Sequence, residues 1–564
     1  MVHVPTLEPA IEKAIANIQH VPRGFEALMF AIYSAAVLTL TDDNCRASLG
    51  EGRTVLLARY VASTKVALCR AKFMSIVVLQ ALMLHILSIR DHYEPRAVWS
   101  LTGTAIRIAE SMGMRVDGSF LGLSPFETEI RRRIWWQLNM HDFRAAELTG
   151  QAKFRYFGLD ETTPKQPANV EDRDLEPSMQ HTPPNSTKAT EMIWCMFRSE
   201  LATFANTQMT RLQKLGKPGF TSEDYTAIDN LKTKDDFIKE LEDLIETKYL
   251  RHCDPSQPLQ LLTLVGGRSA MNLIRFIAHH PRRWAKVKDV SASERQFVWD
   301  LVISLLEQYN MMQSNPQLRR FAWNVPYLIQ WQAVIHVLDT LRANPRHKDA
   351  VKAWQIIDAL YQNNLEMLVR TDRPIFVAVG NLCLKAFNVR IGGGGGGGSR
   401  KGQSSSTPEY ITTLREQRDA AKTRRDAALA SKDKRERQEI LDRVSRLTTA
   451  DAAVAHPHPQ LRPKDGNPTP PSAGTEVRQP SQTTDPISGA ATNTGTGEDN
   501  FWFSDALGED YLTAGAGDMM ELDTDTMLAQ DYWVDTPNGE DIDWNQWDTW
   551  FGTTLGATKG GGPA

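Results

Sequence analysis

Cysteine is scarce in this sequence, and the cysteines that occur lie far apart. There are 5 in 564 residues, and the nearest two, Cys45 and Cys69, are separated by 24 positions. This spacing excludes paired metal ligands of the Cys-x2-Cys type, and the odd, sparse count excludes a disulfide framework and favours a reducing compartment. We interpret the cysteines as small apolar core residues and predict no metal site in this sequence.

Targeting and membrane signals are also lacking. Residues 1–9 hold no basic segment followed by an apolar run, so no secretory signal is predicted there. The most apolar stretch, residues 73–89, contains Gln80 and His85 and is shorter than the roughly 20 residues of a membrane span. We interpret it as a buried helix and expect no membrane partner.

The motifs of common enzyme classes are missing. The sequence has no His-Glu-x-x-His, no Gly-x-Ser-x-Gly, no phosphate loop and no Gly-x-Gly-x-x-Gly after a strand. Asp42-Asp43 is not completed to an Asp-Asp-x-x-Asp motif. His279 and His280 are adjacent and therefore point apart on a helix. The sequence predicts a protein that is not an enzyme, with no catalytic or cofactor-binding residue.

Helical periodicity is what the sequence does contain. Apolar residues recur at helical spacing through residues 1–390, and strand-like alternation is scarce. We predict an all-α fold with one large multi-helix regulatory domain over residues 1–390. The expected helices cover residues 25–40, 56–71, 73–89, 99–112, 124–148, 190–215, 222–249, 258–278, 291–313, 325–341, 348–368 and 374–390. Residues 151–186 are rich in proline and aspartate and predict a long surface loop.

The composition changes after residue 390. Residues 391–407 include seven consecutive glycines, which are typical of a flexible linker. Residues 408–447 predict a charged basic helix, since 13 Lys or Arg accompany 8 Asp or Glu between positions 400 and 446. Arg418 and Arg425 fall on the heptad seam, so a lone solvated helix is favoured over a coiled coil. Residues 448–497, rich in Pro, Thr and Ser, predict a disordered linker.

The last segment, residues 498–564, predicts a disordered acidic tail that carries the charge asymmetry of the chain. Positions 498–551 contain 15 acidic residues and no Lys or Arg, so the remainder of a chain with net charge −4 carries +11. An acidic and hydrophobic mixture is typical of transcriptional activation segments, which fold as short helices into a coactivator groove. A solubilising tail is the alternative. The expected coactivator contacts are Phe501, Trp502, Phe503, Trp533, Trp544, Trp547 and Trp550.

Residues 131–136, Arg-Arg-Arg-Ile-Trp-Trp, form the most distinctive local string. On a helix, Trp135 or Trp136 should enter the core. The arginines should then pair with carboxylates such as Glu127, Asp142 or Glu147. Internal ion pairs are favoured over contact with phosphate.

Around this string the sequence resembles the fungal-specific transcription factor domain, the helical middle homology region of fungal zinc-cluster regulators. The matching stretches are residues 79–82, 98–103, 107–109, 112–118, 123–127, 129–142, 147–150, 167–175 and 190–192. The resemblance extends over roughly residues 20–390. The family-motif residues, expected to be structural, are Arg131, Arg132, Arg133, Trp135, Trp136, Asn169, Asp172 and Asp174.

The resemblance implies a nuclear regulator of transcription, often of a metabolic or secondary-metabolite gene cluster. Its helical domain would control activity, and its acidic segment would recruit the transcription machinery. Zinc is expected for the family, whose N-terminal six-cysteine cluster reads DNA, but this sequence supplies no ligand set. We therefore expect a DNA-binding partner protein, and direct DNA binding stays open.

Two alternative functions stay open, and a nuclear-import signal is expected. The protein is alternatively a helical metabolite-binding or enzymatic protein of the same pathway, or a co-regulator that does not contact DNA. Basic residues of the charged helix are expected to serve nuclear import; they are Lys422, Arg424, Arg425, Lys432, Lys434, Arg435 and Arg437.

Overall fold

Side-chain caps fix where several helices begin. In the computed structural model, the hydroxyl oxygens of Ser75, Thr41 and Ser291 each accept a hydrogen bond from the backbone N–H three residues on. Such caps satisfy amide groups that have no partner inside the helix. The structure describes residues 1–71, 74–93, 95–149, 160–214, 231–281, 290–371, 373–392 and 407–452, and these ranges contain helices but no strand. The predicted all-α fold class is confirmed.

The N-terminal helices pack around one apolar cluster. They are α1 (Val4–Ala16), η1 (Ile18–His20), α2 (Arg23–Thr39), α3 (Asp42–Leu49), α4 (Arg53–Arg70), α5 (Ile76–Ile89), α6 (Pro95–Ser111) and α7 (Pro125–Leu148). Leu68, Leu79, Ile106 and Ile134 meet in this core and are fully buried. Helix α5 is buried on most faces, as its apolar composition predicts.

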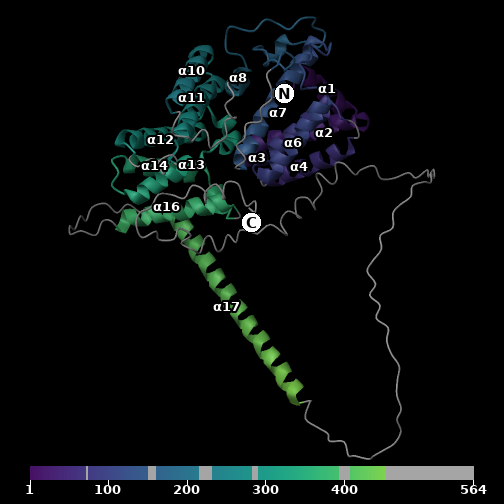
Figure 1. Cartoon of the computed structure of the whole chain (residues 1–564). Helices are drawn as coiled ribbons and strands as arrows, with labels where there is room; N and C mark the ends of the chain where they lie inside the picture. Colours follow the sequence, from purple (N-terminus) through teal and green to yellow (C-terminus); the bar gives the residue numbers. More distant parts are fainter. Residues whose placement is uncertain are drawn as a thin grey trace, which may run out of the picture. The chain divides into compact units, whose positions relative to one another are not determined.

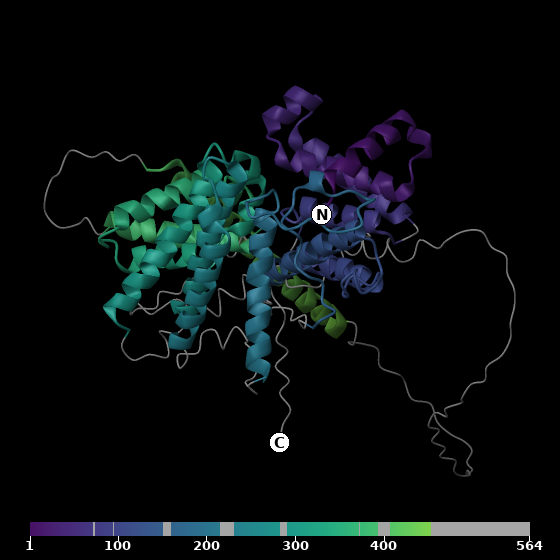
Figure 2. The same cartoon turned by 90° about the horizontal axis from the view of Figure 1, so that it is seen from above.

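A second set of helices surrounds a larger core. It comprises α8 (Ile193–Lys214), α10 (Leu231–Lys248), η4 (Leu250–His252), α11 (Pro258–Ala278), α12 (Ala292–Ser314), η6 (Arg319–Asn324), η7 (Pro326–Leu328), α13 (Trp331–Ala343), α14 (Ala350–Asn363), α15 (Glu366–Val369) and α16 (Pro374–Gly392), whereas η2 (Asp172–Asp174) contacts α1 of the first set. Helices α12, α13, α14 and α16 supply most of this core. Both views of the chain separate these helices, teal to green, from α1–α7 in purple to blue (Figures 1 and 2).

Polar contacts join the two groups of helices. The Arg90 guanidinium donates to Asn324 Oδ1 at 2.7 Å, and Arg144 donates to the carbonyl oxygen of Ile329 at 3.3 Å. Arg90 also lies over the Trp323 ring. The side chains of Arg90 and Arg144 are buried, so these contacts act where water does not compete strongly.

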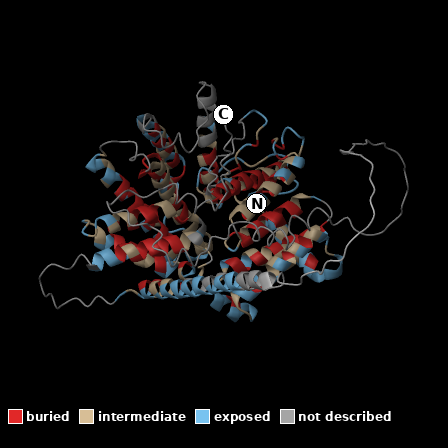
Figure 3. Ribbon diagram, turned by 60° about the horizontal axis from the view of Figure 1, so that its bottom comes forward, coloured by how far each residue is buried: buried red, intermediate tan, exposed pale blue. Residues whose placement is uncertain are grey.

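Helix α17 (Glu409–Ala452) begins inside the second core. Ile411 and Ala421 are fully buried, Leu414 is 5% exposed, and the Tyr410 ring stacks on Tyr361 at 4.5 Å. The prediction of a solvated helix is therefore wrong for its first turns, because an apolar edge there fits the core. The residues up to Lys422 belong to one compact unit, and those from Thr423 to Trp502 form another. In the described part of that second unit the helix is exposed (Figure 3).

Helix α11 is long and apolar enough to span a membrane by length and composition alone. In this fold its apolar face lies in the protein core, because Leu262, Val265, Met271 and Phe276 are buried against neighbouring helices. Core packing therefore accounts for its apolar composition.

Candidate functional site

Helix α7 carries the arginine string and is placed by its first turn. The Ser124 hydroxyl accepts a hydrogen bond from the backbone N–H of Glu127 at 3.2 Å, and Pro125 opens the helix. The start of this helix agrees with the helix expected at residues 124–148. In the next two turns Glu129, Ile130 and residues 133–136 are buried, and Arg131 and Arg132 are partly exposed.

The three arginines make ion pairs in three directions. Arg131 donates to Glu127 Oε1 at 3.0 Å. Arg132 forms a two-bond contact with Asp117, at 2.7 and 2.8 Å. Arg133 donates to Glu129 at 3.0 Å and also to Asp172. Two-bond guanidinium–carboxylate pairs are strong and directional, so the string joins α7 to two separate loops.

Asp117 is the most completely surrounded carboxylate of this network, and its side chain is 0% exposed. Its oxygens also accept from the Lys165 backbone N–H at 3.0 Å and the Ser119 hydroxyl at 2.7 Å. Burial alone would raise the pKa of Asp117, but the hydrogen bonds from Arg132, Ser119 and Lys165 outweigh it and hold that pKa well below its usual range. Asp117 is therefore charged at every physiological pH.

Glu129 holds the neighbouring loop. Its carboxylate is fully buried and accepts from the Ala168 backbone N–H at 3.1 Å as well as from Arg133. Burial raises the pKa of Glu129, and the Arg133 guanidinium and the Ala168 N–H oppose that shift. The energy of this contact depends on Arg133, since a buried carboxylate without a cation is strongly disfavoured.

The loop of residues 160–190 is stapled by Asn169. Its amide nitrogen donates to the carbonyl oxygens of Ser186 and Lys188 at 2.8 and 3.0 Å, and its oxygen accepts from the Thr190 hydroxyl at 2.7 Å. Asp172 accepts from the backbone N–H of Val4, and the Asp174 carboxylate accepts from the Glu171 N–H. All three motif residues therefore bind backbone groups, either in the loop or, for Asp172, at the start of α1.

Both tryptophans of the string are buried, each 3% exposed. The Trp136 indole N–H donates to the carbonyl oxygen of Lys165 at 2.9 Å. Of the expected carboxylate partners, Glu127 is found, and the Glu147 side chain lies outside the described residues. Asp142, the third expected partner, lies about 2.5 turns beyond Arg133 along α7. The sequence analysis did not name Asp117 or Asp172 as partners, because their approach depends on loop folding. It also missed Glu129, although Glu129 lies four residues before Arg133 on the same helix and the i,i+4 spacing could have found it.

The remaining predicted site residues divide between two regions. The coactivator contacts Phe501, Trp502, Phe503, Trp533, Trp544, Trp547 and Trp550 lie outside the described residues. Of the import residues on α17, Lys422, Arg424, Lys434, Arg435 and Arg437 are exposed, whereas the side chains of Arg425 and Lys432 are outside the described set. Among the described residues, no group of three or more His, Cys, Asp or Glu is placed to hold a metal ion.

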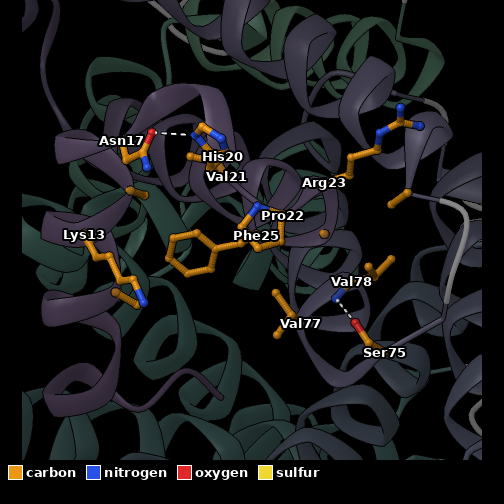
Figure 4. A pocket seen from close by; sticks show the side chains of 14 residues that line it. Lys13, Asn17, His20, Val21, Pro22, Arg23, Phe25, Ser75, Val77 and Val78 are labelled. Carbon is orange, nitrogen blue, oxygen red and sulfur yellow. Dashed lines mark hydrogen bonds between the residues drawn. The ribbon is translucent and has the colours of Figure 1, made fainter.

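Among the pockets on the described residues, two are large enough to admit a small molecule. One, of about 950 Å³, lies between α1, the start of α2 and the start of α5, with the Phe25 ring against it and Lys13 and Arg23 among its lining residues (Figure 4). The other, of about 860 Å³, adjoins the arginine network. It is lined by Arg132, the loop of residues 165–169, residues 182–189, Ile193 and Met196 of α8, and Lys248, Tyr249 and His252.

The fold and the arginine network agree with a comparison against protein families. Residues 3–197, which contain α1 to α7, the stapled loop and the start of α8, match the fungal specific transcription factor domain. Over residues 3–197 this match confirms the resemblance that the motifs implied.

Curated relatives share a longer stretch. The chain is 34% identical over 398 residues to the aurofusarin cluster transcription factor aurR2 of Gibberella zeae, covering 69% of this chain and 58% of that protein. It is 29% identical over 393 residues to the transcriptional regulator AacuB of Aspergillus aculeatus, covering 69% and 52%. The pyriculol/pyriculariol biosynthesis cluster transcription factor 1 of Pyricularia oryzae is 28% identical over 435 residues, covering 74% and 55%.

These relatives are named as transcription factors or regulators, not as enzymes. The match spans little more than half of each relative's own length. No solved structure matches the chain.

Proposed function

We propose that this protein regulates transcription of a secondary-metabolite biosynthetic gene cluster. The observation that carries the proposal is the domain match over residues 3–197 together with 34% identity to a cluster transcription factor. The arginine network supports the same assignment, because the motif residues on which the resemblance rests stabilise loops and do not form a catalytic centre. The helical domain is the regulatory part of the proposal.

The acidic segment is the proposed activating part. Its 15 acidic residues between positions 498 and 551 keep it hydrated while its tryptophans offer apolar anchors. Residues 498–564 fused to a foreign DNA-binding domain should activate a reporter gene. Replacing Trp544 and Trp547 by Ala should reduce activation several-fold, whereas replacing Thr553 and Thr554 by Ala should leave it unchanged. Activation that is absent, or indifferent to the tryptophans, would remove this part of the proposal.

Contact with DNA is proposed to involve a partner protein. The five cysteines of this sequence cannot form a six-cysteine cluster, so no DNA-contacting residue is assigned to it. The purified chain alone should bind promoter DNA of the cluster no more tightly than an unrelated duplex, when both are measured at the same salt concentration. Sequence-selective binding by the chain alone would contradict the partner requirement.

Nuclear localisation is proposed to depend on the basic residues of α17. Lys434, Arg435 and Arg437 are exposed in the described structure, as an import receptor requires. A fluorescent fusion of the full chain should accumulate in nuclei, and replacing these three residues by Gln should return it to the cytoplasm. Replacing Glu436 and Glu439 by Gln is the matched control, and uniform distribution of the unaltered fusion would refute the proposal.

A further inference from the structure

The pocket beside the arginine network has a one-sided charge. Arg132, Lys165, Lys188 and Lys248 line it together with His252, and its lining contains no Asp or Glu. Arg132 is neutralised by Asp117, and the Lys248 ammonium group lies 2.6 Å from Glu200. The Lys165 and Lys188 side chains are exposed, and neither makes an ion pair among the described residues. The ammonium groups of Lys165 and Lys188 therefore give this pocket two positive charges that no carboxylate of the described residues neutralises.

The pocket lining also contains apolar residues. Pro167, Ala168, Pro183, Ile193 and Met196 contribute hydrocarbon surface. The Tyr249 hydroxyl donates to Glu200 at 2.8 Å, so its polar end is already occupied. A volume of about 860 Å³ lies within the range of sites that bury a small molecule. Such a lining favours a ligand with an apolar skeleton.

Hydrogen bonds also fix two of the segments that line the pocket. Asn169 fixes residues 186 and 188 through their carbonyl oxygens, while Glu129 fixes the Ala168 N–H. Lys188 and Ala168 thus approach the same space from two stapled segments. A wall that is already ordered loses little conformational entropy when a ligand binds.

We propose that this pocket binds an organic acid, with its carboxylate between Lys165 and Lys188 and its apolar ring against Ile193 and Met196. Exposed lysines supply attraction that a neutral molecule does not obtain, and the apolar lining supplies the affinity that a small inorganic anion lacks. The site is separate from the pocket beside α1, with which it shares no lining residue. The proposal concerns binding by the chain itself and does not depend on its role in transcription.

Calorimetric titration of the purified full chain at fixed salt tests this site with three probes: 2-naphthoate, the neutral 2-naphthamide and inorganic phosphate. We expect 2-naphthoate to bind with one-to-one stoichiometry and at least tenfold more tightly than either of the others. Equal binding of naphthoate and naphthamide would overturn the ionic part. Phosphate binding as tight as that of naphthoate would reduce the site to an adventitious anion site, and no naphthoate binding would overturn the proposal.

Matched variants locate the site. The double substitution Lys165→Gln and Lys188→Gln should weaken 2-naphthoate binding at least tenfold, whereas Lys13→Gln with Arg23→Gln, at the other pocket, should change it by less than twofold. Unfolding curves check that each variant is folded. Unchanged affinity in the first variant, or a loss in the second, places the ligand elsewhere and overturns the assignment. Reporter activity is measured separately, so a failure here does not affect the transcriptional proposal.

Discussion

At the scale of single residues, the contrast between buried and exposed ion pairs determines which charges matter. Asp117 is 0% exposed and accepts two hydrogen bonds from Arg132, whereas Arg59 and Glu51 are roughly half exposed. A buried carboxylate that loses its charge leaves a cation and several donors unmatched, but a surface pair is largely replaced by water. The two pairs therefore differ in their effect on stability despite equal distances.

Replacing Asp117 by Ala should lower the free energy of unfolding by about 3–5 kcal/mol, because Arg132 is left buried without its partner. Urea unfolding monitored by circular dichroism measures this loss. Glu51→Ala, which breaks the exposed pair, should change it by less than about 1 kcal/mol. Similar losses in the two variants would mean that the arginine network does not stabilise the fold.

Three buried histidines make stability depend on pH. Burial lowers the pKa of His85 and of His336 to about 4 and that of His141 to about 3. Between pH 6.5 and about 4 the unfolded chain binds protons that the folded chain excludes, so stability falls as the pH falls through this range. For His85 alone the loss between pH 7 and pH 4 is about 3 kcal/mol.

Denaturant unfolding at pH 7 and at pH 4.5 tests this dependence. His85→Leu should flatten the difference in unfolding free energy between the two pH values, because one of the excluded protons is removed. His20→Leu, at an exposed position, should leave the difference as it is. A pH dependence that is the same in His85→Leu and the unaltered chain would show that this imidazole is not excluded from protonation by burial.

At the scale of helices, sequence patterns predicted a helix correctly where the residues at its end fix the boundary. The helix expected at residues 124–148 is observed at Pro125–Leu148, because Ser124 and Pro125 act within a single turn. By contrast, α1 was not predicted: Pro9 in its interior argues against a helix, although Pro5 stands in the first turn, where proline is tolerated. The helix expected at residues 348–368 is interrupted at Asn364, whose side chain binds Tyr309 and the Leu360 carbonyl oxygen.

The site shows the same division between local and long-range signals. The arginines and tryptophans were found as a string, and helical geometry predicted that Trp135 or Trp136 enters the core; both are buried. The partners Asp117 and Asp172 lie 15 and 39 positions from Arg132 and Arg133. No spacing rule reaches across a loop of that length, so only the folded chain shows them together.

Helix α11 passes close to its neighbours at Gly266 and Gly267. A Cβ atom at Gly266 would lie 2.6 Å from the Trp194 ring, whereas one at Gly103 in α6 would meet nothing within 4 Å. Gly266→Ala should therefore destabilise the protein by about 1–3 kcal/mol despite the better helix propensity of alanine. Gly103→Ala should stabilise it by up to about 1 kcal/mol. Thermal melting of the two variants should shift in opposite directions, and shifts of the same sign would contradict the predicted close approach.

At the scale of the whole molecule, the start of α17 is part of the domain core. Besides its buried apolar residues, the Tyr410 hydroxyl donates to Asp358 at 2.6 Å. Ile411→Ala should lower the free energy of unfolding by about 2–5 kcal/mol, as for other large-to-small core changes. Leu429→Ala, at a position 52% exposed in the same helix, should change it by less than about 0.5 kcal/mol. Equal effects would show that the first turns of α17 do not pack.

Because the start of α17 packs in the core, the length of the glycine run before it should have little effect on the stability of the protein. The glycine run at positions 392–398 lies between two segments, the end of α16 and the start of α17, that are each anchored in the same core. The entropy of closing such a connection grows slowly, by about 0.6 kcal/mol for each doubling of its length. Copies of the gene that gain or lose a few glycine codons by replication slippage should therefore encode proteins that melt at nearly the same temperature, and natural strains are free to differ there.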